Sequence, residues 1–410
     1  MSYDNSTDFF RRYLEITGGT EVPAFFRRWA ILTGVGAWIG RSACFKRGSF
    51  KIYPNMYVML LGAPGTRKST AIKDVKKILQ RAGYTSFAAE KTTKEKFLMD
   101  LAGVGEEYNA EGFLNLDLGS TTTECLIAAD EFSDFFGNNI MDFVSTLGVL
   151  WDYEGIYKSR IKNGVQVELS DPTISILSGN TQTTFANTFP PEVMGQGFFS
   201  RMVAVYTEAT TKKVTFPPAP SPEDLDYIIT HLYSIQSITG NLEITEEAEN
   251  LVDRIYKTWT PIPDDRFAHY GNRRLGHLLK LVIIHCVARL SNVIEARDVT
   301  YANTVLYHTE HYMPKAFGEF GRAKNASVTH KILGIIEGKL GAVDFSELWA
   351  NVSTDLPGLG ELGDILRGLA AAGKIQPVDG GFMACKKVLD LRYDEMVDYR
   401  YLTKAEIEGE

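Results

Sequence analysis

A glycine-rich turn between an apolar run and a stretch typical of a helix is the feature that most constrains this chain. Residues 57–61 read YVMLL, and residues 62–70 read GAPGTRKST. A short apolar run before such a turn is typical of a buried parallel strand, and the pattern from Ala71 onward is typical of a helix. Gly62 and Gly65 allow backbone amides to approach anionic oxygens, and a helix N-terminus favours negative charge. The sequence therefore predicts a strand, a phosphate-binding loop and a helix, in that order.

This loop predicts the binding of ATP with Mg²⁺. Lys68 is expected to reach the β- and γ-phosphates, and Ser69 to coordinate the metal ion. The common pattern has glycine directly before the lysine, whereas this chain has Arg67, so the loop is a variant. The alternative interpretation is a glycine turn before a surface helix. The predicted nucleotide-binding residues are Gly62, Ala63, Pro64, Gly65, Thr66, Arg67, Lys68, Ser69 and Thr70.

Composition sets the outer bounds on the kind of protein. With 410 residues and 44% hydrophobic content, the chain is long enough for two or three domains. It has no uncharged apolar stretch of about 18 residues and no signal-peptide pattern, which predicts a cytoplasmic protein without a membrane partner. The net charge of −8 argues against a surface that is basic throughout, but it is compatible with a local basic channel.

Three further motifs follow the loop in the sequence. An apolar run ends at Asp130 and Glu131, which predicts a carboxylate near Mg²⁺ and a catalytic base that polarises the attacking water. A second run delivers Asn180 to the carboxyl edge of the sheet, where ligands bind in open α/β folds. Arg201 lies in GQGFFSRMVAVY at an expected domain edge, from which a neighbouring subunit's γ-phosphate is within reach. The alternatives are a common acidic pair, a turn asparagine and a surface arginine.

In this order the motifs resemble the AAA+ superfamily, and more narrowly its MCM-like branch of helicases, over residues 50–310. MCM loops also lack glycine before the lysine, and their arginine finger lies in a Ser-Arg-Phe segment similar to Phe-Ser-Arg-Met at 199–202. The chain also resembles phage and prophage ATPases with an R-K-S loop and a G-F-x-S-R finger. The resemblance implies a hexameric ATP hydrolase in which Asn180 is sensor 1 and Arg201 is the finger. It places sensor 2 at Arg273, with Arg274 as the alternative because Gly276 replaces the family's glutamate.

A predicted hairpin precedes the strand that carries Asn180. Residues 156–169 alternate in polarity and contain Asn163-Gly164, the strongest short-range signal for a two-residue hairpin turn. MCM-like helicases carry a pore hairpin at this place in the chain. Lys158, Arg160 and Lys162 alternate on one face and are predicted to contact the phosphates of a DNA strand threaded through a ring. The alternative is a solvated hairpin face.

The predicted fold class is α/β, with a P-loop core built on a parallel sheet. Proline-rich residues 214–222 mark a boundary, and three short helices before a hairpin at Gly380-Gly381 are typical of a winged helix. The doubled arginines at 11–12 and 27–28 are interpreted as solvated, and the last segment as mobile. The expected strands are 57–61, 86–89, 125–129, 173–177 and 202–206. The expected domains are an N-terminal helical segment (1–52), an AAA+ core (53–215), a helical lid (216–324), a winged helix (325–390) and an acidic tail (391–410).

These features predict a ring-forming DNA helicase of replication, driven by ATP and acting on single-stranded or forked DNA with other replication proteins. The alternative is a helicase loader or initiator-like ATPase that binds DNA or a partner without unwinding. The cationic hairpin favours the helicase, since a loader does not need one. The predicted recognition helix of the winged helix has only Arg367 and Lys374 as cations, so a regulatory role of that module is equally compatible with the sequence.

Overall fold

The computed structural model describes residues 8–103, 123–136, 140–160, 166–189, 197–317, 326–339, 341–356, 358–371, 374–384 and 391–410. The chain divides into two compact units. The first comprises Met1–Gly318 together with Arg392–Glu410, and the second comprises Glu319–Leu391. The chain therefore leaves the first unit after its last long helix and returns to it at residue 392.

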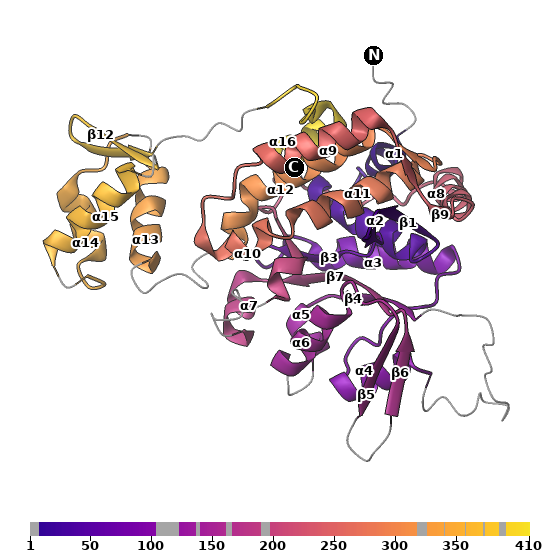
Figure 1. Ribbon diagram of the computed structural model, residues 1–410. Coiled ribbons are helices and arrows are strands. Elements are labelled where there is room, and N and C mark those ends of the chain that lie inside the picture. Colours follow the sequence, from indigo (N-terminus) through magenta and orange to yellow (C-terminus); the bar gives the residue numbers. More distant parts are fainter. Residues whose placement is uncertain are drawn as a thin grey trace. The chain divides into compact units, whose positions relative to one another are not determined.

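A parallel sheet forms the centre of the first unit, and it confirms the α/β prediction (Figure 1). Its strands are β3 (Tyr57–Leu61), β4 (Glu124–Ala129), β7 (Thr173–Asn180) and β8 (Met202–Tyr206). Their order is β4-β7-β3-β8, and every neighbouring pair is parallel. All five residues of β3 are fully buried, as expected where helices cover both faces of a parallel sheet.

Three predicted strands differ from the structure, and the smallest difference is that β4 begins at Glu124 instead of Cys125. The expected strand at 86–89 is reduced to a single parallel bridge between Phe87 and Leu126. The strand expected to end at Leu177 continues to Asn180, because β3 and β4 pair with its two edges as far as Asn180 and Ser178 respectively. This extension carries the backbone of Ser178 and Gly179 into the sheet.

Helices surround the sheet, and those of the predicted lid pack in the same unit. Helices α11 and α12 lie side by side, and α12 also contacts β8. The predicted borders between N-terminal segment, core and lid stay predictions, because these parts form one compact unit. The helices of this unit are α1 (Phe9–Ile16), α2 (Ala24–Ile39), α3 (Lys68–Arg81), α4 (Lys94–Leu101), α5 (Phe132–Phe135), α6 (Ile140–Leu150), α7 (Gln182–Thr188), α8 (Pro222–Ile235), α9 (Glu246–Thr258), α10 (Ala268–Gly271), α11 (Arg274–Ala288), α12 (Ala296–Ala316) and α16 (Lys404–Glu408).

Short strands complete the first unit. An antiparallel hairpin, β5 and β6, projects from the sheet region in Figure 1. Other short strands pair segments that are distant in sequence, since β1 pairs with β9 as well as with β2, and β10 pairs with β11. Their bounds are β1 (Ala43–Arg47), β2 (Phe50–Ile52), β5 (Ile156–Arg160), β6 (Gln166–Ser170), β9 (Gly240–Asn241), β10 (Glu243–Ile244) and β11 (Val293–Ile294).

Helix α2 is buried along its whole length, so the solvated interpretation of its doubled arginines was wrong. Arg27 donates from Nη1 to the carbonyl oxygen of Leu14 at 2.8 Å, and Arg28 forms an ion pair with Glu406. Both arginines lie in a helix that is apolar on all sides, and such a helix is covered by protein all round. Their donors are therefore used internally.

The C-terminal segment is packed, which overturns the prediction of a mobile tail. Tyr399, Tyr401 and Leu402 are buried. Helix α16 begins with a capping box in which the hydroxyl of Thr403 and the carboxylate of Glu406 satisfy each other's backbone amides. The acidic composition misled the interpretation, because Glu406 is fully buried opposite Arg28.

The second unit has its own apolar core, formed by side chains such as Ile332, Leu348, Leu362 and Leu366. Its three helices precede an antiparallel hairpin, and the winged-helix interpretation of this order stays a prediction. Gly381 has φ of 142°, and a Cβ there would lie 2.1 Å from the carbonyl oxygen of Val343. The elements are α13 (Ala326–Glu337), α14 (Phe345–Val352), α15 (Leu359–Ala371), β12 (Ile375–Val378) and β13 (Gly381–Ala384). Within the described ranges of the chain, no helix is long and apolar enough to cross a membrane.

Candidate nucleotide-binding site

The glycine loop connects the end of β3 to the start of α3, as the sequence predicts. Gly65 has φ of 84°, a left-handed conformation that glycine adopts at low cost. A Cβ on Gly62 would lie 2.8 Å from the carbonyl oxygen of Thr207. The two glycines therefore have different roles, since Gly65 permits the turn and Gly62 permits close packing against the exit of β8.

Arg67 occupies a left-handed conformation directly before the helix, with φ of 61°. This explains why glycine is the common residue here, because a side chain in this region costs about 1 kcal/mol or more. The Arg67 side chain donates from Nη2 to Glu21 Oε2 at 2.6 Å, and Glu21 Oε1 accepts from the backbone amide of Val214 at 2.9 Å. These bonds, first that from Val214 and then that from Arg67, lower the pKa of Glu21. Arg67 thus ties the loop to two segments distant in sequence.

Lys68 is buried and folds back over its own loop. Its Nζ donates to the carbonyl oxygens of Gly62 at 2.8 Å and Ala63 at 2.9 Å, and to Thr66 Oγ1 at 3.0 Å. Burial lowers the pKa of Lys68, while the charge of Glu131 raises it. Loop oxygens thus hold the ammonium group within the electrostatic influence of Glu131, and phosphate oxygens are able to replace them.

The register of the sheet brings the acidic pair and Asn180 to the edge that carries the loop. Strand β7 lies between β3 and β4, with Asn180 paired to Leu61 and Ser178 paired to Ala129. A Cβ on Gly179 would lie 2.7 Å from the carbonyl oxygen of Asp130 and 3.3 Å from Lys68 Cβ. The approach of the loop helix to the acidic pair therefore depends on a glycine at 179.

Asn180 is fully buried and only partly satisfied. Its Oδ1 accepts from the backbone amide of Thr181 at 3.1 Å, whereas its Nδ2 has no hydrogen-bond partner among the residues that the structure describes. A buried donor without a partner costs about 1–3 kcal/mol. An acceptor oxygen from a ligand or water at this edge would remove that cost.

Ser69 and Asp130 form a donor set that suits a nucleotide-bound Mg²⁺. Nucleotide Mg²⁺ keeps several waters and takes only one or two protein groups besides the phosphates. Ser69 lies in the first turn of α3, and Asp130 follows the last residue of β4. Asp130 is ion-paired with Lys73, whose pKa this contact raises. Loading the metal would therefore require Asp130 to exchange Lys73 for the ion.

Arg201 lies at the opposite edge of the sheet from the loop of its own chain. It directly precedes Met202, which pairs with Tyr57 at the start of β3, whereas the loop follows Leu61. At about 3.3 Å per residue the two edges are about 15 Å apart. The structure thus brings Lys68, Glu131 and Asn180 together and keeps Arg201 away from them.

A second arginine, Arg273, lies near enough to Arg201 to influence its pKa. Arg201 Nη1 donates to the carbonyl oxygen of Gly197, and its buried Nε has no partner within the described ranges. Burial, and next the positive charge of Arg273, lower the pKa of Arg201. Arg273 is exposed at the start of α11, so two arginines from separate elements share this edge.

Arg274, the alternative for sensor 2, is part of a buried network. Its Nε donates to Glu310 Oε1 at 2.7 Å and its Nη2 to Asn303 Oδ1 at 2.9 Å. Its guanidinium also lies over the ring of Trp259. These contacts give Arg274 a structural role and leave Arg273 as the arginine available to a ligand.

The hairpin forms, but its register differs from the prediction. Arg160 pairs with Gln166 and Lys158 with Glu168, whereas a two-residue turn at Asn163-Gly164 would pair Arg160 with Val167. Lys158 Nζ lies 2.7 Å from Glu168 Oε1, so its charge is paired across the strands. Lys162 and the predicted turn fall outside the described residues. The shift by one residue is what the sequence reasoning missed, since it places Glu168 rather than Leu169 opposite Lys158.

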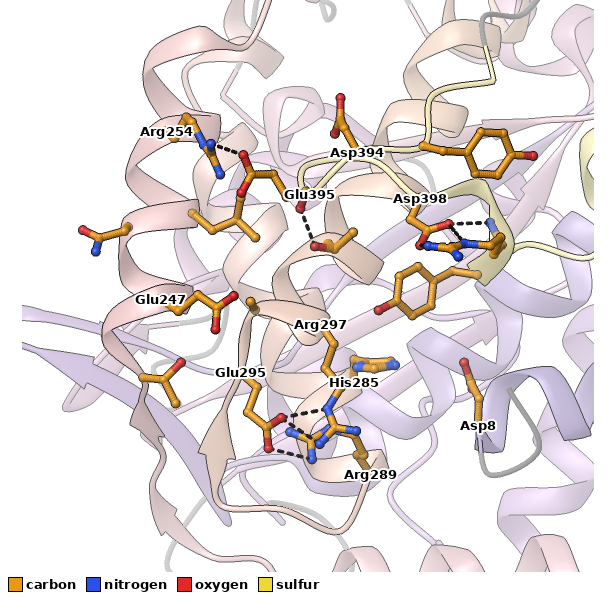
Figure 2. A pocket seen from close by; sticks show the side chains of 18 of the residues that line it. Asp8, Glu247, Arg254, His285, Arg289, Glu295, Arg297, Asp394, Glu395 and Asp398 are labelled. Atoms are coloured by element: carbon orange, nitrogen blue, oxygen red, sulfur yellow. Dashed lines mark hydrogen bonds and ion pairs between the residues drawn. The ribbon is translucent and has the colours of Figure 1, made fainter. Parts of the chain in front are cut away.

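A large cavity in the described part of the chain lies away from the loop (Figure 2). It has a volume of about 1510 Å³ and is bordered by α1, α9, the start of α12 and the C-terminal segment. Several of its charged side chains pair with one another, as in Arg254 with Glu395 and Arg297 with Glu295. It contains neither a glycine turn nor an acidic pair at a strand end, so it lacks the features that mark the loop as a candidate phosphate site.

No protein-family model matches this chain, and no curated protein matches its sequence. The assignment of the site therefore depends on its residues and their geometry.

Proposed function

We propose that this chain is an Mg²⁺-dependent ATP hydrolase of the AAA+ type, on the MCM-like branch, in which neighbouring copies share each active site. One observation carries the proposal. Lys68, Glu131 and Asn180 converge on one edge of the sheet, while Arg201 lies at the opposite edge. An arginine about 15 Å from its own loop is useful to the loop of a second copy.

The residues of the loop edge divide the work of hydrolysis. Lys68 exchanges its loop carbonyls for phosphate oxygens, and Glu131 accepts the proton of the attacking water. Asn180 Nδ2 orients that water, which satisfies a donor that has no partner among the described residues. A Mg²⁺ ion held by Ser69 and Asp130 neutralises charge on the phosphates when bound.

Opposed edges imply head-to-tail assembly. An interface between two different surfaces gives a ring when its rotation closes, and we expect a closed ring of six copies from the resemblance to the MCM-like branch. Arg201 and Arg273 of one copy then face the phosphates of the next. Hydrolysis depends on assembly for this reason.

The chemistry is tested with three single variants. Lys68→Ala should lose ATP binding, and Glu131→Gln should bind ATP with unchanged affinity but release phosphate at least about 100-fold more slowly. Lys77→Ala, an exposed lysine on the same helix α3, is the matched control and should keep both properties. Wild-type turnover by Glu131→Gln would refute the assignment of the base, and wild-type affinity of Lys68→Ala would refute the loop.

We extend the proposal to a replicative DNA helicase that acts with other replication proteins. What supports it is the hairpin, which leads into the amino end of β7 and exposes Arg160 with Lys158 on one face. One specific observation favours the alternative of a loader or initiator-like ATPase. Glu168 neutralises Lys158 and leaves Arg160 as the unpaired cation of the described part of that face.

Hairpin variants that remove positive charge and a variant that removes negative charge decide between the helicase and the loader. Lys158→Ala with Arg160→Ala should spare basal ATP hydrolysis and abolish unwinding of forked DNA, whereas Glu168→Gln frees Lys158 and should tighten DNA binding. The slope of log affinity against log salt should become steeper by about one in Glu168→Gln. Unwinding at the wild-type rate by the double variant would refute the pore assignment. A wild-type protein that unwinds only when a separate helicase is added would establish the loader.

A further inference from the structure

A buried histidine lies beside the segment that ends in Arg201. His277 is on the first turns of the lid helix α11, and its amide donates to the carbonyl oxygen of Arg273 at 3.2 Å. Residues four apart lie on the same face of a helix, so Arg273 and His277 share one face. The His277 ring is fully buried, stacks on Tyr270 at 5.2 Å and meets the edge of Trp151 at 5.7 Å.

The imidazole contacts the backbone directly before Arg201. His277 Nε2 lies 3.2 Å from the carbonyl oxygen of Ser200, which requires the proton to be on Nε2. The Ser200 hydroxyl donates to the carbonyl oxygen of Gly197 at 2.7 Å, and the Arg201 amide donates to that of Phe198 at 2.9 Å. His277 thus connects helix α11 by a hydrogen bond to the carbonyl oxygen of Ser200, in a tight turn whose last residue is Arg201.

Packing alone does not account for a histidine here. Its Nδ1 is buried without a partner in the described part of the chain, a cost that an apolar side chain of similar size would avoid. Burial lowers the pKa of His277 to about 4, although the bond to Ser200 raises it. The ring is therefore neutral near pH 7 and adds no positive charge beside Arg201 and Arg273. What the position gains from histidine is a neutral, rigid donor aimed at Ser200.

We propose that His277 is a positioning residue that fixes Arg201 to the lid helix, so that Arg201 and Arg273 approach the neighbouring copy's nucleotide as one unit. The inference rests on the proposed shared site and adds to it the group that sets the finger's position.

Two substitutions separate positioning from packing. His277→Leu fills the space without a donor and should lower kcat by about 100-fold, the cost of misplacing a catalytic group by about 1 Å, with KM for ATP unchanged. His277→Gln retains an amide donor for the Ser200 carbonyl and should recover most of that loss. Equal kcat values for the two variants would overturn the proposal.

Mixed assemblies test the direction of the effect. A Lys68→Ala copy lacks a working loop but keeps its finger, and an Arg201→Ala copy lacks the finger but keeps its loop. His277→Leu should abolish the hydrolysis of the mixture when placed in the Lys68→Ala copy and leave it intact when placed in the Arg201→Ala copy. Equal loss in both placements indicates structural damage and overturns the positioning role, as does no loss in either.

The mixture of Lys68→Ala and Arg201→Ala proteins without His277→Leu distinguishes failure of the shared site from failure of the positioning role. If Lys68→Ala and Arg201→Ala do not restore hydrolysis to one another, the shared site itself fails and His277 has no finger to position. If they do restore it, the placement of His277→Leu decides the further proposal alone.

Discussion

Gly179 sits where the loop helix and the acidic pair approach most closely. We expect Gly179→Ala to force the Asp130 carbonyl and Lys68 apart, because its Cβ would lie 2.7 Å from that oxygen. ATP hydrolysis should fall by about 100-fold while the protein stays folded. Gly276→Ala is the matched control, since its Cβ would meet only Ile52 Cδ1 at 4.0 Å. For both variants, phosphate release measures ATP hydrolysis and thermal unfolding measures whether the protein stays folded. Wild-type hydrolysis by Gly179→Ala would contradict the packing argument.

Some residues of the candidate site are predictable from the sequence next to them, whereas others depend on contacts with residues distant in sequence. Lys68, Glu131 and Asn180 were predictable because each lies at or soon after the carboxyl end of an apolar strand, and the carboxyl ends of parallel strands meet at one edge. His277 and Glu21 carry no local signal, because their roles arise from contacts with Ser200 and Arg67, which are distant in sequence. The position of Glu168 in the hairpin was predictable, but its pairing with Lys158 was not, because the observed register differs from the predicted one by one residue.

At the scale of elements, α16 is held to α2 by the Arg28–Glu406 ion pair, in which both side chains are fully buried. Arg28 also donates to the Tyr301 hydroxyl at 2.8 Å and to the carbonyl oxygen of Tyr401 at 3.0 Å. Removing one partner of a buried pair leaves an uncompensated charge, which typically costs about 3–5 kcal/mol. The ion pair thus fastens the end of the chain to the N-terminal part.

We therefore expect Glu406→Ala to lower the free energy of unfolding by about 3–5 kcal/mol. Glu408→Ala, an exposed change on the same short helix, should alter it by less than about 0.5 kcal/mol. Arg28→Met combined with Glu406→Leu should recover most of the loss, because no charge stays buried. Urea unfolding curves measure all three. A Glu406→Ala variant as stable as Glu408→Ala would show that the tail is not held as described.

Strands were the most predictable elements. β3 and β8 have the predicted bounds, because each is a short apolar run that ends at a glycine or a polar residue. The packed tail and the buried Arg27 and Arg28 were not predictable, since a charged side chain is buried only where a distant partner compensates it. The composition of a segment does not reveal whether such a distant partner exists.

At the scale of the whole molecule, two neutral buried histidines make stability depend on pH. Burial lowers the pKa of His277 and of His308 to about 4, from an ordinary value of 6.5. Between these values the unfolded chain binds protons that the folded chain does not. The contribution of both rings is complete above pH 6.5 and falls as the pH drops towards 4.

The urea midpoint should accordingly fall between pH 6.5 and pH 4. His308→Gln removes one of the two groups and should give a shallower fall, whatever its effect at pH 7. His269→Gln, an exposed histidine, should keep the wild-type slope. The same slope in wild type and His308→Gln would contradict the burial of a neutral ring.

The most direct test of the central claim is the rate of ATP hydrolysis in an equimolar mixture of Lys68→Ala and Arg201→Ala proteins. Each should be inactive alone. Together they should regain about a quarter of the wild-type rate per copy, because random assembly sets an intact loop beside an intact finger at about one interface in four. A mixture as inactive as its parents, in assemblies shown to contain both, would contradict a site shared between neighbouring copies.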